Sequence, residues 1–183
     1  MATTLNQIAQ YLDNRHWKYH IQAADSRIIT GVIANNVDQL PIAIALKEDG
    51  EYLELAAPQL LQVKDHIYKG LLFQTLLAIS WEVKMLRWEY DPLDGEIRAS
   101  IGFPLEDASL TERQFNRILS GLIQIVDKYA MPRLQAVLET GIDPAEKALG
   151  ERLLLTLQEI LPDGSLNLLE QALTDRKKRG FDS

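Results

Sequence analysis

The chain has 183 residues and a formal net charge of −7, with 46% hydrophobic and 25% charged residues. These proportions are those of an ordinary globular protein, and they exclude a collagen, a disordered acidic tail and a membrane bundle. The sequence holds no cysteine, so disulfides, thiolate metal sites and cysteine nucleophiles are excluded as well.

The charge and the N-terminal residues bear on partners and location. We expect no nucleic-acid binding, because a net negative chain repels phosphate backbones unless it has a local basic patch. The dense basic run at 176–179 is better explained by the preference of helix C-termini for cations. The first residues do not resemble a signal peptide, and no apolar stretch approaches the ~20 residues of a membrane span. We therefore expect a cytoplasmic protein that binds no membrane.

The first third of the chain predicts a short helix followed by an antiparallel meander. Thr4 and Gln7 fit a capping box, and apolar residues recur at helical spacing over 5–15. The period then changes to two, and turn signals separate four expected strands at 17–23, 27–34, 40–47 and 51–57. Asp49-Gly50 predicts a type I′ turn between the last two strands, and Pro58 is expected to end the meander.

The middle of the chain predicts a helix and a second hairpin. An apolar stripe over 60–78 indicates a helix with a break at Gly70. Strands at 81–90 and 96–103 then flank a turn at 91–95. The apolar face of the first of these strands switches near Met85. Either a β-bulge or a strand covered from opposite sides at its two ends explains the switch.

The last third predicts helices. Two overlapping capping boxes, at 109–112 and 111–114, start a helix that Pro132 kinks or restarts and that Gly141 ends. Asp143 and Pro144 open another helix, which a break at 162–164 separates from a last one.

The fold class that follows is α+β. We expect an antiparallel sheet, made of a meander and a hairpin, packed by helices in the order α-β(3–4)-α-β-β-α. This arrangement fills a first domain over 1–141, and a C-terminal helical hairpin over 142–183 forms an extension.

The order of elements resembles the type III secretion chaperone-like fold, and within it the YbjN-type bacterial proteins, over about residues 5–140. The most telling segment is the hairpin at 87–98, which leads through Phe103-Pro104-Leu105 into Ser109-Leu110-Thr111 and the next helix. The resemblance implies a small acidic protein, commonly dimeric, that binds segments of other proteins or has no known activity. It carries over no catalytic motif, and residues 142–183 depart from the pattern.

No combination of residues predicts an active site. His16 and His20 lie four apart, but the period of two places them on or beside a strand without paired carboxylates. Asp91, Asp94 and Glu96 lack the spacing of a calcium loop. The ten glycines form no phosphate-binding loop, and there is no nucleophile elbow. We predict that the protein is not an enzyme and binds no cofactor or metal.

The large apolar residues of the second predicted hairpin are the candidate binding site: Trp81, Met85, Trp88 and Tyr90. In a two-layer domain one hairpin face packs on helices, so large residues on the other face either meet a partner or form ordinary core.

The function we predict is a non-enzymatic protein-binding module, chaperone-like or adaptor-like, that acts as a homodimer. It would hold an amphipathic helix or an extended segment of a partner. The alternative is a small-molecule-binding or regulatory domain with a ligand between the sheet and the long helix.

Overall fold

The computed structural model describes residues 2–106, 108–162 and 164–180. The chain divides into unit 1, Met1–Gly141, and unit 2, Ile142–Ser183. Unit 1 is an α+β structure with a six-stranded sheet of order β1-β2-β3-β4-β6-β5, in which all neighbouring strands are antiparallel. The predicted fold class is confirmed.

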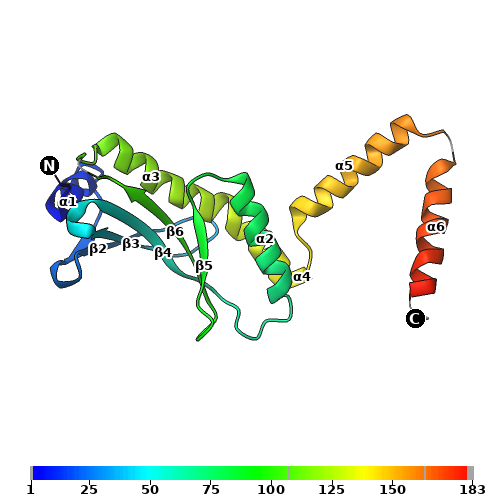
Figure 1. Ribbon diagram of the computed structural model, residues 1–183, viewed down its shortest axis with the longest axis horizontal. Helices are drawn as coiled ribbons and strands as arrows, with labels where there is room; N and C mark the ends of the chain where they lie inside the picture. The colour runs from blue at the N-terminus through cyan, green and yellow to red at the C-terminus, as the bar shows by residue number, and fades with distance from the viewer. Residues whose placement is uncertain (1, 107, 163, 181–183) are drawn as a thin grey trace. The chain divides into compact units, whose positions relative to one another are not determined.

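The strands of unit 1 are β1 (Tyr19–Gln22), β2 (Arg27–Val32), β3 (Leu40–Lys47), β4 (Tyr52–Gln62), β5 (Arg87–Tyr90) and β6 (Glu96–Pro104). Its helices are α1 (Leu5–Asn14), α2 (Lys69–Glu82), α3 (Glu112–Gln124) and α4 (Met131–Thr140). A π-helical segment, Ile125–Ala130, joins α3 to α4, and α3 runs along one face of the sheet (Figure 1).

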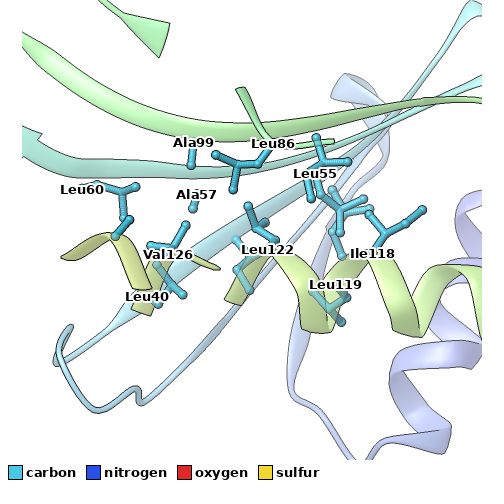
Figure 2. Packing of buried hydrophobic residues seen from close by; sticks show 14 of the residues in the cluster. Leu40, Leu55, Ala57, Leu60, Leu86, Ala99, Ile118, Leu119, Leu122 and Val126 are labelled. Carbon is cyan, nitrogen blue, oxygen red and sulfur yellow. The ribbon is translucent and has the colours of Figure 1, made fainter. Parts of the chain in front are cut away.

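The core lies between this face of the sheet and the helices. Alternate residues of β3 and β4 are buried, as the period of two requires. The buried stripe of α3 packs against them, and its capping box at Thr111 and Gln114 fixes where the helix starts. Figure 2 shows side chains of α3 and the π-helical segment gathered against sheet residues: Ile118, Leu119, Leu122 and Val126 with Leu55, Ala57 and Ala99.

The meander does not end at Pro58, as predicted, because β4 continues to Gln62. Pairing with β6 shifts register between Ala57 and Leu61, and this irregularity accommodates a proline, which has no N–H for the ladder. Gln59 takes a left-handed φ of 56° there and donates its N–H to the Glu96 carboxylate. The predicted helix at 60–78 therefore begins only at Lys69.

The hairpin between β3 and β4 is confirmed, but its turn is longer than the predicted type I′ turn. Lys47 pairs with Tyr52, so four residues make the connection instead of two. Asp49 and Gly50 both have positive φ, as the sequence led us to expect. A Cβ on Gly50 would lie 2.4 Å from the carbonyl oxygen of Thr3, so packing against the N-terminal segment also demands glycine.

The predicted strand at 81–90 is wrong in its first half. Helix α2 continues to Glu82, and β5 begins only at Arg87. The switch of apolar face near Met85 is therefore a change of element, at the loop 83–86 that joins α2 to β5. Met85 has a left-handed φ of 70° in this loop.

Unit 2 consists of α5 (Pro144–Ile160) and α6 (Ser165–Gly180). The Asp143 carboxylate accepts the N–H of Ala145, which confirms the predicted start of α5. Asp163, in the predicted break, and the side chains of 177–179, in the basic run, lie outside the described residues. That the two units are separate folding domains stays a prediction.

Candidate functional site

An open apolar cavity of about 620 Å³ lies between β6, α3 and the loop 83–86. We call it the groove. Its apolar lining comes from all three elements and the start of the π-helical segment: Met85, Ile101, Phe103, Ile118, Gly121 and Ile125. Met85 is 54% exposed, so this lining is not closed off from water.

The groove lies where the sheet loses a strand. β6 pairs with β4 as far as Pro104, but β5 pairs with β6 only as far as Ser100. In the register of the described strands, Ile101–Pro104 therefore has a neighbour on one side only. The Ile101 and Phe103 side chains lie on the helix-facing side of this edge, opposite the buried Leu55 and Leu53 of β4.

A missing side chain on α3 deepens the groove. Gly121 lies in the groove lining, and a Cβ added to it would meet no atom within 4 Å. Glycine inside a helix costs roughly 1 kcal/mol relative to alanine, so its presence needs a reason. Here it leaves open space beside Ile118 and Ile125.

The remaining residues of the groove lining are polar, and none of those described is acidic: Lys84, Gln114, Arg117, Ser120 and Gln124. Lys84 comes from the loop 83–86 and Arg117 from α3, and both are exposed. The rim of the groove is therefore cationic, although the whole chain carries −7.

An ion pair fixes the α2 end of the loop 83–86. The Glu82 carboxylate accepts a hydrogen bond from Arg133 Nη1 at 2.6 Å, and another from the Tyr129 hydroxyl. The hydrogen bond to Glu82, with burial and the charge of Glu82, raises the pKa of Tyr129. The end of α2 is thereby tied to the π-helical segment and to α4.

A second network fixes the β5 end of the loop. Glu89 accepts hydrogen bonds from Arg87 at 2.8 Å, from the Ser100 hydroxyl at 2.7 Å and from Arg98. Arg87 also pairs with Glu54 of β4 at 2.9 Å. Burial alone would raise the pKa of the Glu89 carboxyl, but these hydrogen bonds outweigh burial and lower it. The start of β5 is thus held against β6 and β4.

Helix α2 presents a second apolar surface. Leu77 is 72% exposed and Trp81 is 92% exposed, although the opposite side of the same helix carries the buried Leu72, Leu76 and Ile79. Leu77 and Trp81 are one turn apart and share a side with the exposed Gly70 and Gln74. We call Gly70, Gln74, Leu77 and Trp81 the α2 face; it carries no charge.

The four residues singled out from the sequence lie in three different places. Trp81 lies on the α2 face and Met85 lines the groove. Trp88 and Tyr90 are opposite the buried Ala99 and Ile97, on the side of the sheet that packs against the core. The ring of Tyr90 meets that of Phe73 from α2 edge-on, with centroids 4.9 Å apart.

Sequence patterns missed Lys84, Arg117 and Gly121. A glycine inside the apolar stripe of a strongly capped helix is the signal that could have located the groove. Among the residues that the structure describes, no group of three or more His, Asp or Glu could hold a metal ion. Nor does the described part of the chain hold a helix with both the length and the apolarity to cross a membrane.

Comparisons place the fold among solved structures. Neither the models of protein families nor the curated proteins contain a match to the chain. YbjN, a candidate transcription regulator from E. coli, matches 70% of this chain and 89% of its own, with a TM-score of 0.55 and 13% identity.

Two further structures align less well. The HopA1-SchA chaperone-effector complex gives a TM-score of 0.47 at 15% identity, over 66% of this chain and 88% of that chain. The ExsC-ExsE complex gives a TM-score of 0.41 at 19% identity, over 56% of this chain and 73% of that chain. Of these three structures, YbjN has the TM-score to support a statement about fold, and this chain has the YbjN-type fold that the sequence predicted.

Proposed function

We propose that the protein is a non-enzymatic protein-binding module, chaperone-like or adaptor-like, whose groove holds an apolar segment of another protein. The observation that supports this most directly is the open apolar groove beside the one-sided edge of β6. A contiguous apolar groove that is open to water and rimmed by polar residues is typical of an interaction site. We also propose that the protein works in the cytoplasm.

The edge of β6 favours an extended segment. The Asp91 N–H donates to the Glu96 carbonyl, so Glu96 and every second residue after it direct their backbone groups toward the β5 side. Gly102 therefore offers its N–H and carbonyl to that side beyond the end of β5. A segment lying there adds main-chain hydrogen bonds, while its alternate side chains enter the groove.

Filling the groove tests this proposal. Gly121→Leu places a side chain in the open space, and replacing a helical glycine favours the helix. Gly150→Leu, on α5, is the matched control, because a Cβ there also meets no atom within 4 Å. Peptides are selected on the full chain from a displayed random library and measured by fluorescence anisotropy.

The selected peptides should bind the wild type and Gly150→Leu equally, and Gly121→Leu more than about tenfold more weakly. A failure of any peptide to be enriched would reject the proposal. So would peptides whose affinity the Gly121→Leu change leaves intact.

We further propose that the protein acts as a homodimer through the α2 face. A helix that is apolar on all sides is normally buried, yet Leu77 and Trp81 are exposed. Two chains of charge −7 repel each other, so a second copy would approach best through a face without charged side chains, and the α2 face is such a face. A Trp side chain in an interface buries roughly 150–250 Å², so Trp81 would be a main contributor.

Sedimentation of the full chain tests the dimer. Trp81→Glu should weaken self-association more than about tenfold, because a carboxylate would be buried against its own copy. Leu93→Glu is the control, since Leu93 is 80% exposed in the β5–β6 turn and lies outside the α2 face. A wild type that stays monomeric at all concentrations would reject this part of the proposal.

The groove also favours a second function, a small-molecule-binding or regulatory domain. Its volume of about 620 Å³ falls in the range of small-ligand pockets, and it lies between the sheet and α3. A panel of metabolites is screened by thermal shift. A compound that stabilises the wild type and Gly150→Leu, but not Gly121→Leu, would favour this function over protein binding.

A further inference from the structure

We propose that the segment held in the groove is acidic as well as apolar, and that its carboxylates pair with Lys84 and Arg117. This inference rests on the proposed protein-binding function. It adds the chemistry of the partner, which the apolar lining alone does not specify.

The two cations differ from the arginines of the sheet. Arg27, Arg87 and Arg98 all form ion pairs with carboxylates of this chain. Within the described residues, Lys84 and Arg117 form none. Other exposed cations, such as Lys18 and Arg113, also form no ion pair with a described carboxylate, but they do not line the groove. It is the position of two such cations in the lining of one apolar cavity, with no acidic residue beside them there, that points to an anionic partner.

The positions of the cations match an amphipathic segment. Lys84 is on the loop 83–86 and Arg117 is on α3. Two of the three elements that line the groove therefore each carry a cation. Apolar side chains of the partner would enter the groove, and carboxylates beside them would reach the rim. The Arg117 guanidinium can bind a carboxylate through two parallel hydrogen bonds, which fixes orientation as well as charge.

Charge also argues against a basic segment as the partner. The net −7 repels acidic proteins at long range, so an acidic segment must find a local cationic site to bind. A basic segment would be attracted to the chain as a whole, but at the groove it would face Lys84 and Arg117 at short range. Like charges brought together in an interface suppress binding, so the groove selects against basic segments.

The test uses the full chain and two synthetic peptides that share the same apolar residues. The intervening positions are Glu in one peptide and Lys in the other, and affinities are measured by fluorescence anisotropy. The Glu peptide should bind about tenfold tighter in dilute salt, and the ratio should approach one in about 1 M salt. Lys84→Glu with Arg117→Glu should reverse the preference, whereas Lys18→Glu, at the opposite edge of the sheet, should leave it unchanged.

Each of the other outcomes would contradict the acidic partner, protein binding in the groove, or both. Equal affinities for the two peptides, both lost in Gly121→Leu, would overturn the acidic partner and leave protein binding in the groove intact. Tighter binding of the Lys peptide would do the same. Absence of binding by either peptide would overturn both proposals. Self-association of the wild type that Gly121→Leu abolishes would replace the acidic partner with a second copy of the chain.

Discussion

Two neighbouring leucines of α2 test both the orientation of this helix and the role of its outer face. Leu76 is 6% exposed and packs in the core, whereas Leu77 is 72% exposed on the α2 face. A buried leucine replaced by alanine costs about 2–5 kcal/mol of unfolding free energy. For a chain of this size each kcal/mol lowers Tm by roughly 2–4 °C, so Leu76→Ala should lose about 4–20 °C.

The matched variant Leu77→Ala keeps the same chemistry at an exposed position. In dilute protein it should change stability by no more than about 0.5 kcal/mol. Thermal unfolding is measured at several protein concentrations, because a dimer makes Tm concentration-dependent. Leu77→Ala should reduce that dependence, and Leu76→Ala should lower Tm at every concentration. Equal losses for the two variants in dilute protein would mean that α2 does not present the side described.

Three further variants test particular contacts. The Glu89 carboxylate has a lower pKa in the folded protein than in the unfolded chain. It therefore stabilises the fold at pH values above its unfolded pKa of about 4.5, and this contribution disappears as the pH falls through the folded pKa. Acid titration of stability should therefore be shallower for Glu89→Gln than for wild type. Gly95→Ala should cost more than about 2 kcal/mol in urea unfolding, since Gly95 has a φ of +85° and its Cβ would lie 2.4 Å from the Lys64 nitrogen. Thr111→Ala removes the acceptor of the Gln114 N–H at the start of α3 and should cost about 1 kcal/mol in the same assay, and an unchanged stability would mean that this cap does not support the helix.

Local patterns were sufficient for much of the fold. The period of two in β3 and β6, the capping box at Thr111 and the glycine at 141 each reflect the conformation of a few consecutive residues. Because these signals agree with the tertiary packing, they place strands and helices with little error. The order of elements then limits the sheet to few topologies.

The errors arise where tertiary contacts override a local signal. Pro58 normally ends a strand, but the register shift between β4 and β6 removes the need for its missing N–H. Trp81 looks like a strand residue because it is aromatic, yet α2 extends past it to Glu82. The ion pair of Glu82 with Arg133 joins residues far apart in sequence, and no local pattern contains it.

The groove was harder to predict than the fold because it forms where a side chain on α3 and a strand beside β6 are missing. Gly121 contributes no side chain, and β5 contributes no strand beyond Ser100. The glycine in the apolar stripe of α3 was the one local signal for the groove, and the end of the β5 pairing has no local signal. The large side chains attracted attention instead, and two of them, Trp88 and Tyr90, pack against the core.

The loop 83–86 explains how a surface groove can be formed before a partner arrives. The left-handed backbone of Met85 costs of order 1–3 kcal/mol, and it persists only if both ends of the loop are held. Glu82 is bonded to Arg133 and Tyr129 at one end, and Arg87 is bonded to Glu89 and Glu54 at the other. A partner then meets Met85 already in place, so little ordering of the loop opposes binding. Selectivity is left to the shape of the cavity and to the charges at its rim.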